Sequence, residues 1–274
     1  MPRALPNFAT HDDDSKNHRI DTPIEPPEFI RRYLARQLQV RGGEPGRLRV
    51  LDVGCGRGDT VAWLCAQGWD AHGIDVSADY LARGQGYLRD ALGADPARLQ
   101  LINADFSYPW PDAAFDIVLS DQVIEHVGDL DQFAAEVARV SAPGAVGMHI
   151  FPAKWRPVET HLLMPFAHWL PKGTLRRGAV SGLLKAGVGA KYFEDLPHSD
   201  RAAIYNAFSE DETFYRPLRD TVQTFHRHGL RCDALRPSRE KIAFHLASSP
   251  EAALPLLGWL YRNFASVVLY TEKP

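Results

Sequence analysis

The stretch "LDVGCGRGDT", residues 51 to 60, decides the fold of this chain. Its first residues end a strand-like apolar run, three glycines follow within five positions, and an acidic residue opens a helical pattern. Glycine lets the backbone approach a ligand closely, and the first amide groups of a helix point toward such a ligand. The stretch therefore predicts a ligand-binding turn between a strand and a helix.

Strand-like and helix-like segments alternate on both sides of this turn. An amphipathic helix from Pro27 comes first, and helices separate strands expected at 48–53, 70–75, 98–103, 115–120 and 145–151. This order is typical of a parallel sheet with crossover helices. Two later strands, at 230–235 and 265–271, predict an antiparallel hairpin at the sheet edge. The expected fold class is a doubly wound α/β domain.

The sequence divides into a tail, one domain and two insertions. Residues 1–26 are polar and rich in proline, so we expect a flexible tail; the domain covers 27–274. Prolines interrupt the α/β rhythm in 152–212, which we interpret as a helical cap, and a second helical insertion is expected at 238–263. His11 and the acids at 12–14 are contiguous and cannot easily converge on one ion, so no metal site is predicted.

Composition places few limits on the partner. The 274 residues are 45% hydrophobic, carry a net charge of −3 and include three cysteines. The charge gives no reason to expect nucleic acid, and the odd cysteine count without a CxxC pair favours a reducing compartment. We found neither a secretory leader nor a run of about 18 apolar residues. The expectation is a cytoplasmic, soluble protein of unknown oligomeric state.

Acidic residues follow three of the first four strands. Because ligands of open parallel sheets bind at the carboxyl ends of the strands, we expect the glycine turn, Asp75, Asp105 with Phe106, and Asp121 to converge there. An acid after the second strand can accept hydrogen bonds from both hydroxyls of a ribose, so Asp75 is the expected ribose contact.

The turn departs from the dinucleotide fingerprint GxGxxG. Gly54 and Gly56 fit that pattern, but Asp59 occupies its last position. An acid at the start of a helix repels a pyrophosphate, which is the group that this position otherwise binds. The sequence therefore predicts a nucleoside-like ligand without phosphates and with positive charge.

Four segments resemble the successive motifs of class I S-adenosylmethionine-dependent methyltransferases of the small-molecule type. These segments are "VLDVGCGRGD" (50–59), "GIDVS" (73–77), "NADFSYPWPDAAFDIVLSDQVIEHV" (103–127) and "ARVSAPGA" (138–145). The resemblance covers about 48–151 and implies a Rossmann-like, seven-stranded sheet and S-adenosyl-L-methionine as cofactor. It is weaker beyond residue 151, where "ETHLLMPFAHWLP" (159–171) is similar to a segment of some such enzymes in bacterial sugar and lipid contexts.

The resemblance implies a set of cofactor-binding residues. It places the methionine moiety at Asp52, Gly54 and Gly56, the ribose at Asp75, and the adenine at Asp105 with Phe106; the full set expected around the cofactor is Asp52, Gly54, Cys55, Gly56, Asp75, Val76, Asp105, Phe106 and Asp121. Structural alternatives remain for three of them. Asp105 can cap a turn, Phe106 can pack in the core, and Cys55 can be present for its small size.

Methyl transfer from a sulfonium mainly needs alignment and exclusion of water, so a base is optional. For an alcohol acceptor a histidine is the usual base. The candidates are His126, beside Glu125 after the fourth strand, and His161, with His168 as a further histidine of the cap. His149 lies within a strand and is expected to be structural.

The cap is the expected substrate-selecting part. Between 154 and 191 it holds seven basic residues and a single acid, Glu159, among many apolar residues. This mixture is typical of a lid over an apolar, anionic molecule or of a segment that contacts a membrane, here 160–191. A solvated basic face over an ordinary helical subdomain is the alternative.

The sequence thus predicts S-adenosylmethionine-dependent methylation of a small molecule at an oxygen atom. A lipid- or sugar-linked molecule is the candidate acceptor. Two other classes stay open: a catalytically silent module that binds the same cofactor, and an NAD-dependent oxidoreductase of similar architecture.

Overall fold

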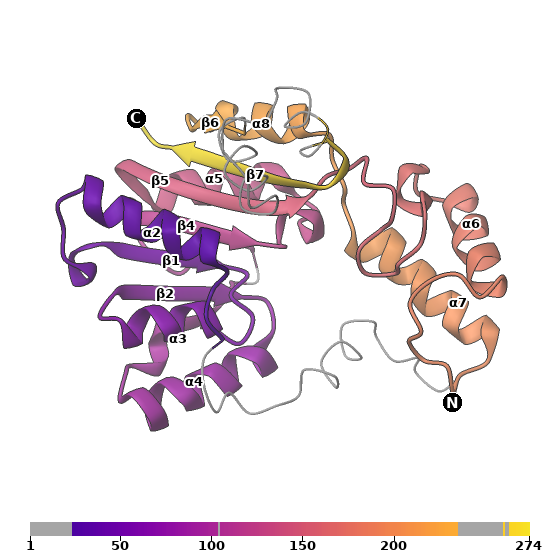
Figure 1. The fold of residues 1–274 in the computed structure, drawn as a ribbon, viewed down its shortest axis with the longest axis horizontal. Coiled ribbons are helices and arrows are strands. Elements are labelled where there is room, and N and C mark those ends of the chain that lie inside the picture. The colour runs from indigo at the N-terminus through magenta and orange to yellow at the C-terminus, as the bar shows by residue number, and fades with distance from the viewer. Residues whose placement is uncertain (1–23, 104, 235–259, 261–262) are drawn as a thin grey trace.

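One seven-stranded sheet organises the part of the chain that the structure describes. This computed structural model describes residues 24–103, 105–234, 260 and 263–274. The strand order is β3-β2-β1-β4-β5-β7-β6 (Figure 1), with β1 to β5 parallel and β7 antiparallel to both of its neighbours. The predicted mostly parallel sheet with an antiparallel edge hairpin is confirmed. The strands are β1(Arg49–Val53), β2(Asp70–Asp75), β3(Leu99–Leu101), β4(Phe115–Asp121), β5(Ser141–Pro152), β6(Arg231–Asp233) and β7(Ser266–Glu272).

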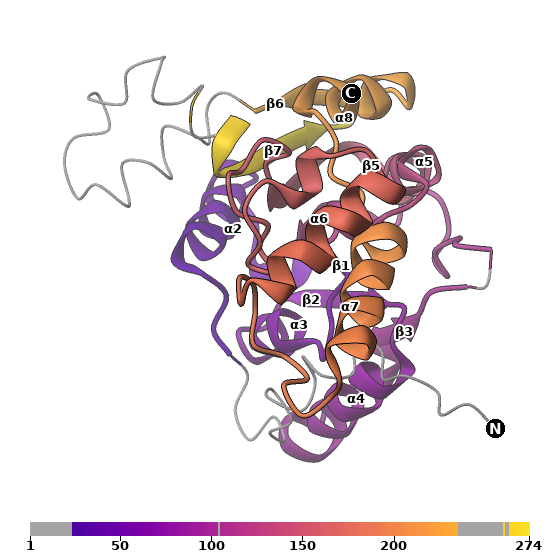
Figure 2. The same cartoon turned by 90° about the vertical axis from the view of Figure 1, so that its right-hand side faces the viewer.

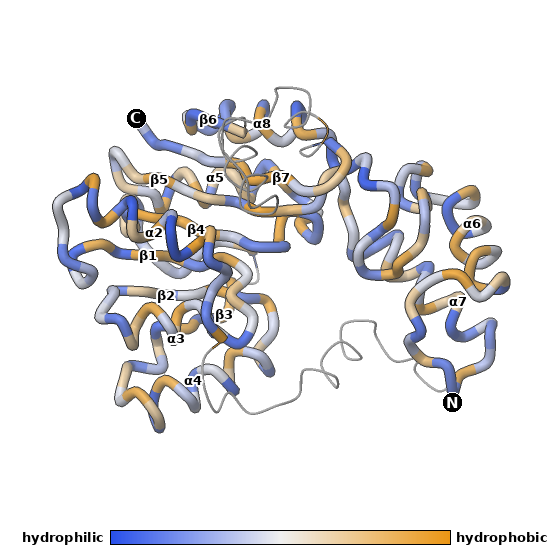
Figure 3. Tube along the Cα trace, in the orientation of Figure 1, coloured by the Kyte–Doolittle hydropathy of each residue, from blue (hydrophilic) through white to orange (hydrophobic). Residues whose placement is uncertain are grey.

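Helices cover both faces of this sheet. On one face lie α2(Glu28–Val40), α3(Asp59–Ala66) and α4(Ala78–Leu92), and on the other α5(Leu130–Val140) and α8(Leu218–Arg227). In Figure 3 the helices alternate between hydrophobic and hydrophilic stretches, as expected of helices that bury one side. Two separate apolar layers result, one on each face of the sheet.

Side-chain caps begin two of these helices. Ser77 accepts a hydrogen bond from the Tyr80 amide at 3.3 Å at the start of α4. Asp129 accepts bonds from the amides of Asp131 and Gln132, both at 3.0 Å, at the start of α5. These caps satisfy backbone donors that a helix start leaves unpaired.

The strand order reverses between β1 and β4, at the centre of the sheet. From β1 the chain adds β2 and β3 on one side and then returns to add β4 and β5 on the other. The crossover helices leave a crevice at the carboxyl ends of strands where such a reversal occurs. The fold therefore directs attention to the residues just after β1 and β4.

The start of β5 differs from the prediction. The strand predicted at 145–151 begins earlier, at Ser141. A register shift lies between the pairs Phe115↔Ser141 and Ile117↔Val146, and Gly144 has a φ of 75°. An irregular stretch of strand therefore precedes the predicted one, because Ser141 already pairs with Phe115 of β4.

The cap lies between β5 and α8 and has a hydrophobic core of its own. It contains the short helices η4(Ala167–Trp169) and η5(Phe208–Glu212) and the helices α6(Thr174–Lys185) and α7(His198–Ala207). Figure 1 shows it beyond the carboxyl ends of β4 and β5, and Figure 2 shows α6 and α7 in front of the sheet. The predicted second insertion at 238–263 lies almost entirely outside the described residues. In the described part of the chain, no helix has the length and apolar character needed to cross a membrane.

Candidate functional site

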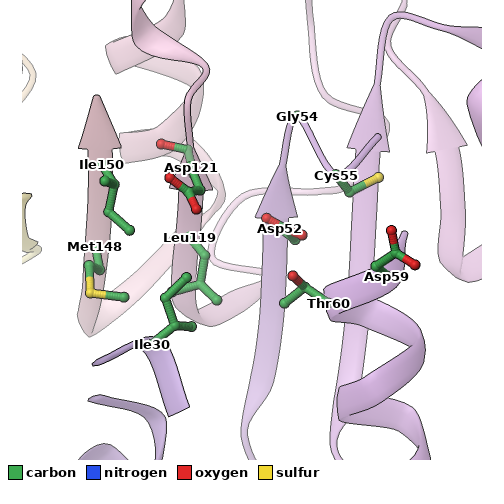
Figure 4. Close-up of a pocket in the computed structure, with 11 residues that line it drawn as sticks. Ile30, Asp52, Gly54, Cys55, Asp59, Thr60, Leu119, Asp121, Met148 and Ile150 are labelled. Carbon is green, nitrogen blue, oxygen red and sulfur yellow. The ribbon is translucent and has the colours of Figure 1, made fainter. Parts of the chain in front are cut away.

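A pocket opens where the strand order reverses, at the carboxyl ends of β1 and β4 (Figure 4). The carboxyl groups of Asp52, Asp59 and Asp121 contribute to it, together with the Thr60 hydroxyl at the start of α3. Its apolar side comes from α2 and from β4 and β5. The lining residues are Ile30, Asp52, Gly54, Cys55, Asp59, Thr60, Leu119, Ser120, Asp121, Met148 and Ile150.

In the glycine turn after β1, neighbouring side chains pack against two of the glycines and leave the third uncovered. A Cβ at Gly54 would overlap the side chain of Val123, and one at Gly58 would come within 2.6 Å of Leu99. At Gly56, by contrast, no described atom lies within 4 Å of a Cβ position. Close packing thus requires glycine at two positions, and only Gly56 leaves bare backbone facing open space.

Asp75 ties the glycine turn to the end of β2. One of its carboxylate oxygens accepts the Gly56 amide at 2.8 Å, and the other accepts the Ser77 amide at 2.8 Å. Each carboxylate oxygen retains a second lone pair for a ligand hydroxyl. Val76, the next residue, is 69% exposed. The predicted ribose contact is therefore held in a fixed orientation beside the turn.

Asp52 is the buried carboxyl group of the pocket. Burial, followed by the charges of Asp121, Asp75 and Asp59, raises its pKa to about 8. A cation placed among these carboxyl groups would favour the ionised form. Arg57 pairs with Asp59 at 3.2 Å, so part of the negative charge is already compensated by the protein.

The loop after β3 answers one of the open alternatives. Phe106 is 61% exposed with a φ of 60°, so the prediction that it could pack in the core was wrong. Asp105 accepts hydrogen bonds from the Ser107 amide at 3.0 Å and the Ser107 hydroxyl at 2.7 Å, which is the turn-capping role considered above. Neither residue lines the pocket, and their role at the adenine stays a prediction.

Cys55 both lines the pocket and packs against β2. A Cβ at Gly73 would lie 2.7 Å from the Cys55 sulfur, so the small residue on β2 makes room for this side chain. Burial raises the pKa of the Cys55 thiol well above its ordinary value. The thiol is therefore protonated and unreactive, in keeping with a structural role in the turn.

The two histidines predicted as catalytic candidates lie together, although 35 positions separate them. The Nε2 atoms of His126 and His161 are 3.3 Å apart, and their rings meet edge to face. His126 belongs to the short helix η3(Ile124–His126) after β4, and His161 lies at the start of the cap. The cluster that they form, which also includes Glu125, is called the histidine cluster below.

Glu159 organises the cap side of this cluster. This buried carboxylate accepts bonds from the amides of His161, at 2.9 Å, and Leu162, and it faces the Nδ1 atom of His161 at 2.9 Å. The Tyr215 hydroxyl also donates to it. Burial opposes ionisation, but the hydrogen bonds from these partners outweigh it and hold the pKa of Glu159 below its ordinary value.

Glu125 is buried in the cluster without a hydrogen-bond partner. Its side chain is 2% exposed, and neither carboxyl oxygen meets a donor among the described residues. Burial raises the pKa of Glu125 to about 8. Buried carboxyl groups are normally satisfied, so this one calls for an explanation.

A segment from the far end of the cap fastens the loop that carries the cluster. Arg216 donates to the carbonyls of Val127 and Gly128, both at 2.7 Å, and the Phe214 amide donates to the Glu125 carbonyl at 2.6 Å. Both ends of the cap therefore meet at η3. Since Val123 covers Gly54, the same loop also joins the histidine cluster to the glycine turn.

The other two histidines considered are buried. His149 is fully buried, bonds Ser120 at 2.8 Å and has its pKa lowered to about 3 by burial. His168 is 1% exposed and packs on Tyr215, and burial lowers its pKa to about 4. Neither imidazole reaches the surface of the site.

Sequence reasoning missed three polar members of the site: Glu125, Glu159 and Tyr215. One signal was present, because a glutamate precedes each candidate histidine, in "IEH" (124–126) and in "ETH" (159–161). Nothing in the sequence says that these two short segments meet. Tyr215 lies in the extended stretch before α8, where we had expected a helix from about 214.

Part of the chain is similar to known methyltransferases. Residues 51–148 match a family described as a methyltransferase domain. A probable chloroplastic tocopherol O-methyltransferase of Oryza sativa subsp. japonica is 38% identical over 97 residues, covering 35% of this chain and 26% of the relative. Norajmaline N-methyltransferase of Rauvolfia serpentina is 36% identical over 97 residues, covering 35% and 33%. The chain thus spans about a quarter to a third of the length of these relatives.

The fold has solved counterparts. The crystal structure of an S-adenosylmethionine-dependent methyltransferase from Mesorhizobium loti matches with a TM-score of 0.50 and 18% identity, covering 87% of this chain and 96% of the other. This similarity extends past the family match and includes parts of the chain beyond residue 148.

Proposed function

We propose that this chain, whose residues 51–148 match a methyltransferase domain family, transfers a methyl group from S-adenosylmethionine to an oxygen atom of a small-molecule acceptor. The observation that carries the proposal is the position of the histidine cluster, which lies on the loop directly after β4 beside the pocket-lining end of that strand. Val123 packs on the glycine turn, and the histidine cluster follows directly after it.

The residues of the pocket fit the cofactor. S-Adenosylmethionine supplies a methyl group on a positively charged sulfur and also carries an ammonium group. Asp52 and Asp121 offer negative charge to those cations. Gly54 and Cys55 line the pocket, and Gly56 beside them leaves its Cβ side open. We assign the ribose to Asp75 and Val76, and the adenine to Asp105 and Phe106.

The histidine cluster suits an acceptor that must lose a proton. A backbone carbonyl and a carboxylate occupy the Nδ1 sides of His126 and His161, so both rings direct an Nε2 atom toward each other. His126 is an exposed residue, at the outer side of the cluster. We assign these two histidines to the deprotonation of an acceptor hydroxyl. A neutral amine, by contrast, can attack the methyl group through its lone pair before it loses a proton.

The cap supports an acceptor with apolar and anionic parts. Most of the apolar cap residues pack in its own core, which weakens the idea of an amphipathic surface helix over 160–191. Exposed apolar side chains remain at Trp155, Val158, Leu163 and Phe166, and Lys154 lies 5.4 Å from the Trp155 ring. A lipid- or sugar-linked acceptor would use this face.

The compartment also remains a proposal. The three cysteines are free thiols in the described chain. Free thiols are common where disulfides are reduced, which supports the expected cytoplasmic location.

Calorimetry tests the cofactor first. We expect S-adenosylhomocysteine to bind at a one-to-one ratio and NAD⁺ not to bind, and the reverse result would favour an oxidoreductase. Incorporation of a radioactive methyl group into a panel of phenolic, sugar and lipid-linked hydroxyl compounds then tests turnover. Tight cofactor binding without incorporation into any acceptor would favour the catalytically silent module.

Vesicle co-sedimentation separately tests whether the cap contacts a membrane. Vesicles with anionic lipid should retain the chain, and combined substitution of Trp155 and Phe166 with serine should release it. Equal sedimentation of both forms would remove the membrane from the proposal and leave the acceptor assignment unaffected.

A further inference from the structure

The hydrogen bonds around the two histidines fix where their protons lie. His126 Nδ1 is 2.8 Å from the Glu212 carbonyl oxygen, which can only accept, so this nitrogen carries the hydrogen. His161 Nδ1 faces the carboxylate of Glu159 at 2.9 Å and donates to it in the same way. Each neutral ring then carries its remaining lone pair on Nε2. Two lone pairs at 3.3 Å face each other, an arrangement that needs a positive group between them.

The spacing of the nitrogens matches that of metal ligands. Two nitrogens bound at about 2.05 Å to a tetrahedral Zn²⁺ lie about 3.3 Å apart. The observed separation of the Nε2 atoms is 3.3 Å. A single shared proton would hold the pair together as well, but it would leave the neighbouring carboxyl group unexplained.

That neighbouring group is Glu125. Its two oxygens are buried without a hydrogen-bond partner among the described residues, and one of them lies within 4.8 Å of both histidine nitrogens. With the two histidines it makes a set of two imidazoles and one carboxylate. This donor set, with further positions open, is typical of catalytic zinc sites.

The surroundings of the ligands also fit a metal centre. Histidines that bind metals almost always donate their other ring N–H to a carboxylate or a backbone carbonyl. Here Glu159 serves His161 and the Glu212 carbonyl serves His126. We propose that Glu125, His126 and His161 form a binding site for one divalent first-row transition-metal ion, with Zn²⁺ as the ion that the spacing fits.

The ion would have a role in catalysis only if the proposed methyl transfer is correct. Three protein ligands leave at least one position of a tetrahedral ion for an acceptor hydroxyl. A hydroxyl bound to Zn²⁺ loses its proton to solvent at a much lower pKa than a free one. In that case the two histidines act as ligands, and deprotonation of the acceptor no longer requires either of them as the base.

Zinc binding can be tested without cofactor or acceptor, so its failure is separate from failure of the proposed function. The full chain is stripped with a chelator, dialysed against ZnCl₂ and analysed for bound zinc. We expect one equivalent in the wild type and its loss in His126→Ala, His161→Ala and Glu125→Gln. Glu159→Gln, which removes only the carboxylate behind His161, should weaken binding about 10- to 100-fold.

Two histidine variants serve as matched controls. His198→Ala removes an exposed histidine of the cap outside the cluster, and His11→Ala removes the histidine beside the acids at 12–14. Both should retain the full equivalent of zinc. Absence of zinc binding in the wild type, retention in His126→Ala, or loss in His11→Ala would each overturn the proposal.

A spectroscopic test needs no substitution and so does not depend on how the variants fold. Co²⁺ added to the stripped wild-type chain should give the intense visible bands of a four- or five-coordinate ion. The faint spectrum of six-coordinate aqueous Co²⁺ would contradict the site. Circular dichroism of each variant checks that loss of zinc is not loss of fold.

Discussion

The loop after β4 connects the glycine turn and the histidine cluster, but the two are built in different ways. The turn comes from ten consecutive residues and is completed by contacts from neighbouring strands. The cluster is assembled from three short segments, after β4, at the start of the cap and at its end. The first can be recognised from local sequence, whereas the second exists only after the cap has closed on the sheet.

This difference separates two tasks. Residues of the sheet hold a ligand common to many enzymes, and residues contributed by the cap determine what is done with it. Substitutions on the two sides should therefore change different measurements, namely cofactor affinity and the rate of transfer. Four predictions test that separation.

The largest effect is expected for His126→Ala. Loss of this imidazole should lower the rate of methyl transfer to a hydroxyl acceptor by about 10²- to 10⁴-fold. Calorimetry should find the affinity for S-adenosylhomocysteine unchanged within about twofold, because the pocket lies on the other side of Val123. His198→Ala is the control. A rate equal to that of the wild type would remove the cluster from catalysis.

Asp75→Ala should have the opposite profile. It removes the acceptor of two backbone amides and the expected partner of the ribose hydroxyls. Two charge-assisted hydrogen bonds of about 1.5 kcal/mol each correspond to a loss of roughly 100-fold in cofactor affinity. Asp70→Ala, at the other end of the same strand, should change this affinity little. Similar affinities in both variants would contradict the assigned ribose contact.

A pair of glycines on α4 offers the sharpest control of stability. A Cβ at Gly84 would overlap the Arg57 carbonyl of the glycine turn, whereas one at Gly86 meets open space. Gly84→Ala should lower the free energy of unfolding by about 1–3 kcal/mol and also weaken cofactor binding. Gly86→Ala should raise the same free energy by up to about 1 kcal/mol. Denaturant titration measures both, and equal effects would show that α4 does not press on the turn.

The smallest effect concerns Asp52→Asn and depends on pH. The pKa of Asp52 is about 8 in the fold against an ordinary value of 3.8, so the unfolded chain ionises first. The contribution of Asp52 to wild-type stability should therefore fall as the pH rises from about 4 to 8. The variant lacks this loss, and its stability relative to the wild type should grow by about 1 kcal/mol per pH unit between pH 5 and pH 7.

The same substitution should weaken cofactor binding, because the amide cannot offer charge to a cation. Thermal melts across this pH range, with and without S-adenosylhomocysteine, measure both changes. A relative stability that stays constant with pH would show that Asp52 is already ionised in the free protein. Contributions from Glu125 are common to both proteins and cancel.

Local pattern made most of the sheet predictable and little of the histidine cluster. The five parallel strands, the turn and the Ser77 cap follow from apolar runs, glycine spacing and a capping side chain, all within a few residues. The core position considered for Phe106 failed because the backbone of that loop turns the ring outward. Glu125 and Glu159 could not be placed, because their roles depend on contacts between segments about 35 positions apart.

The separate hydrophobic core of the cap has a consequence for how such a chain can change. Leu162, Val180, Tyr205 and their neighbours pack on one another and form a cluster distinct from the two sheet layers. Mutations that remodel the acceptor side can therefore accumulate there without loosening the scaffold beneath. The direct test is to graft the cap of another enzyme between Ala153 and Pro217. The chimeric protein should bind the cofactor of this sheet and show the acceptor preference of the enzyme that supplied the cap.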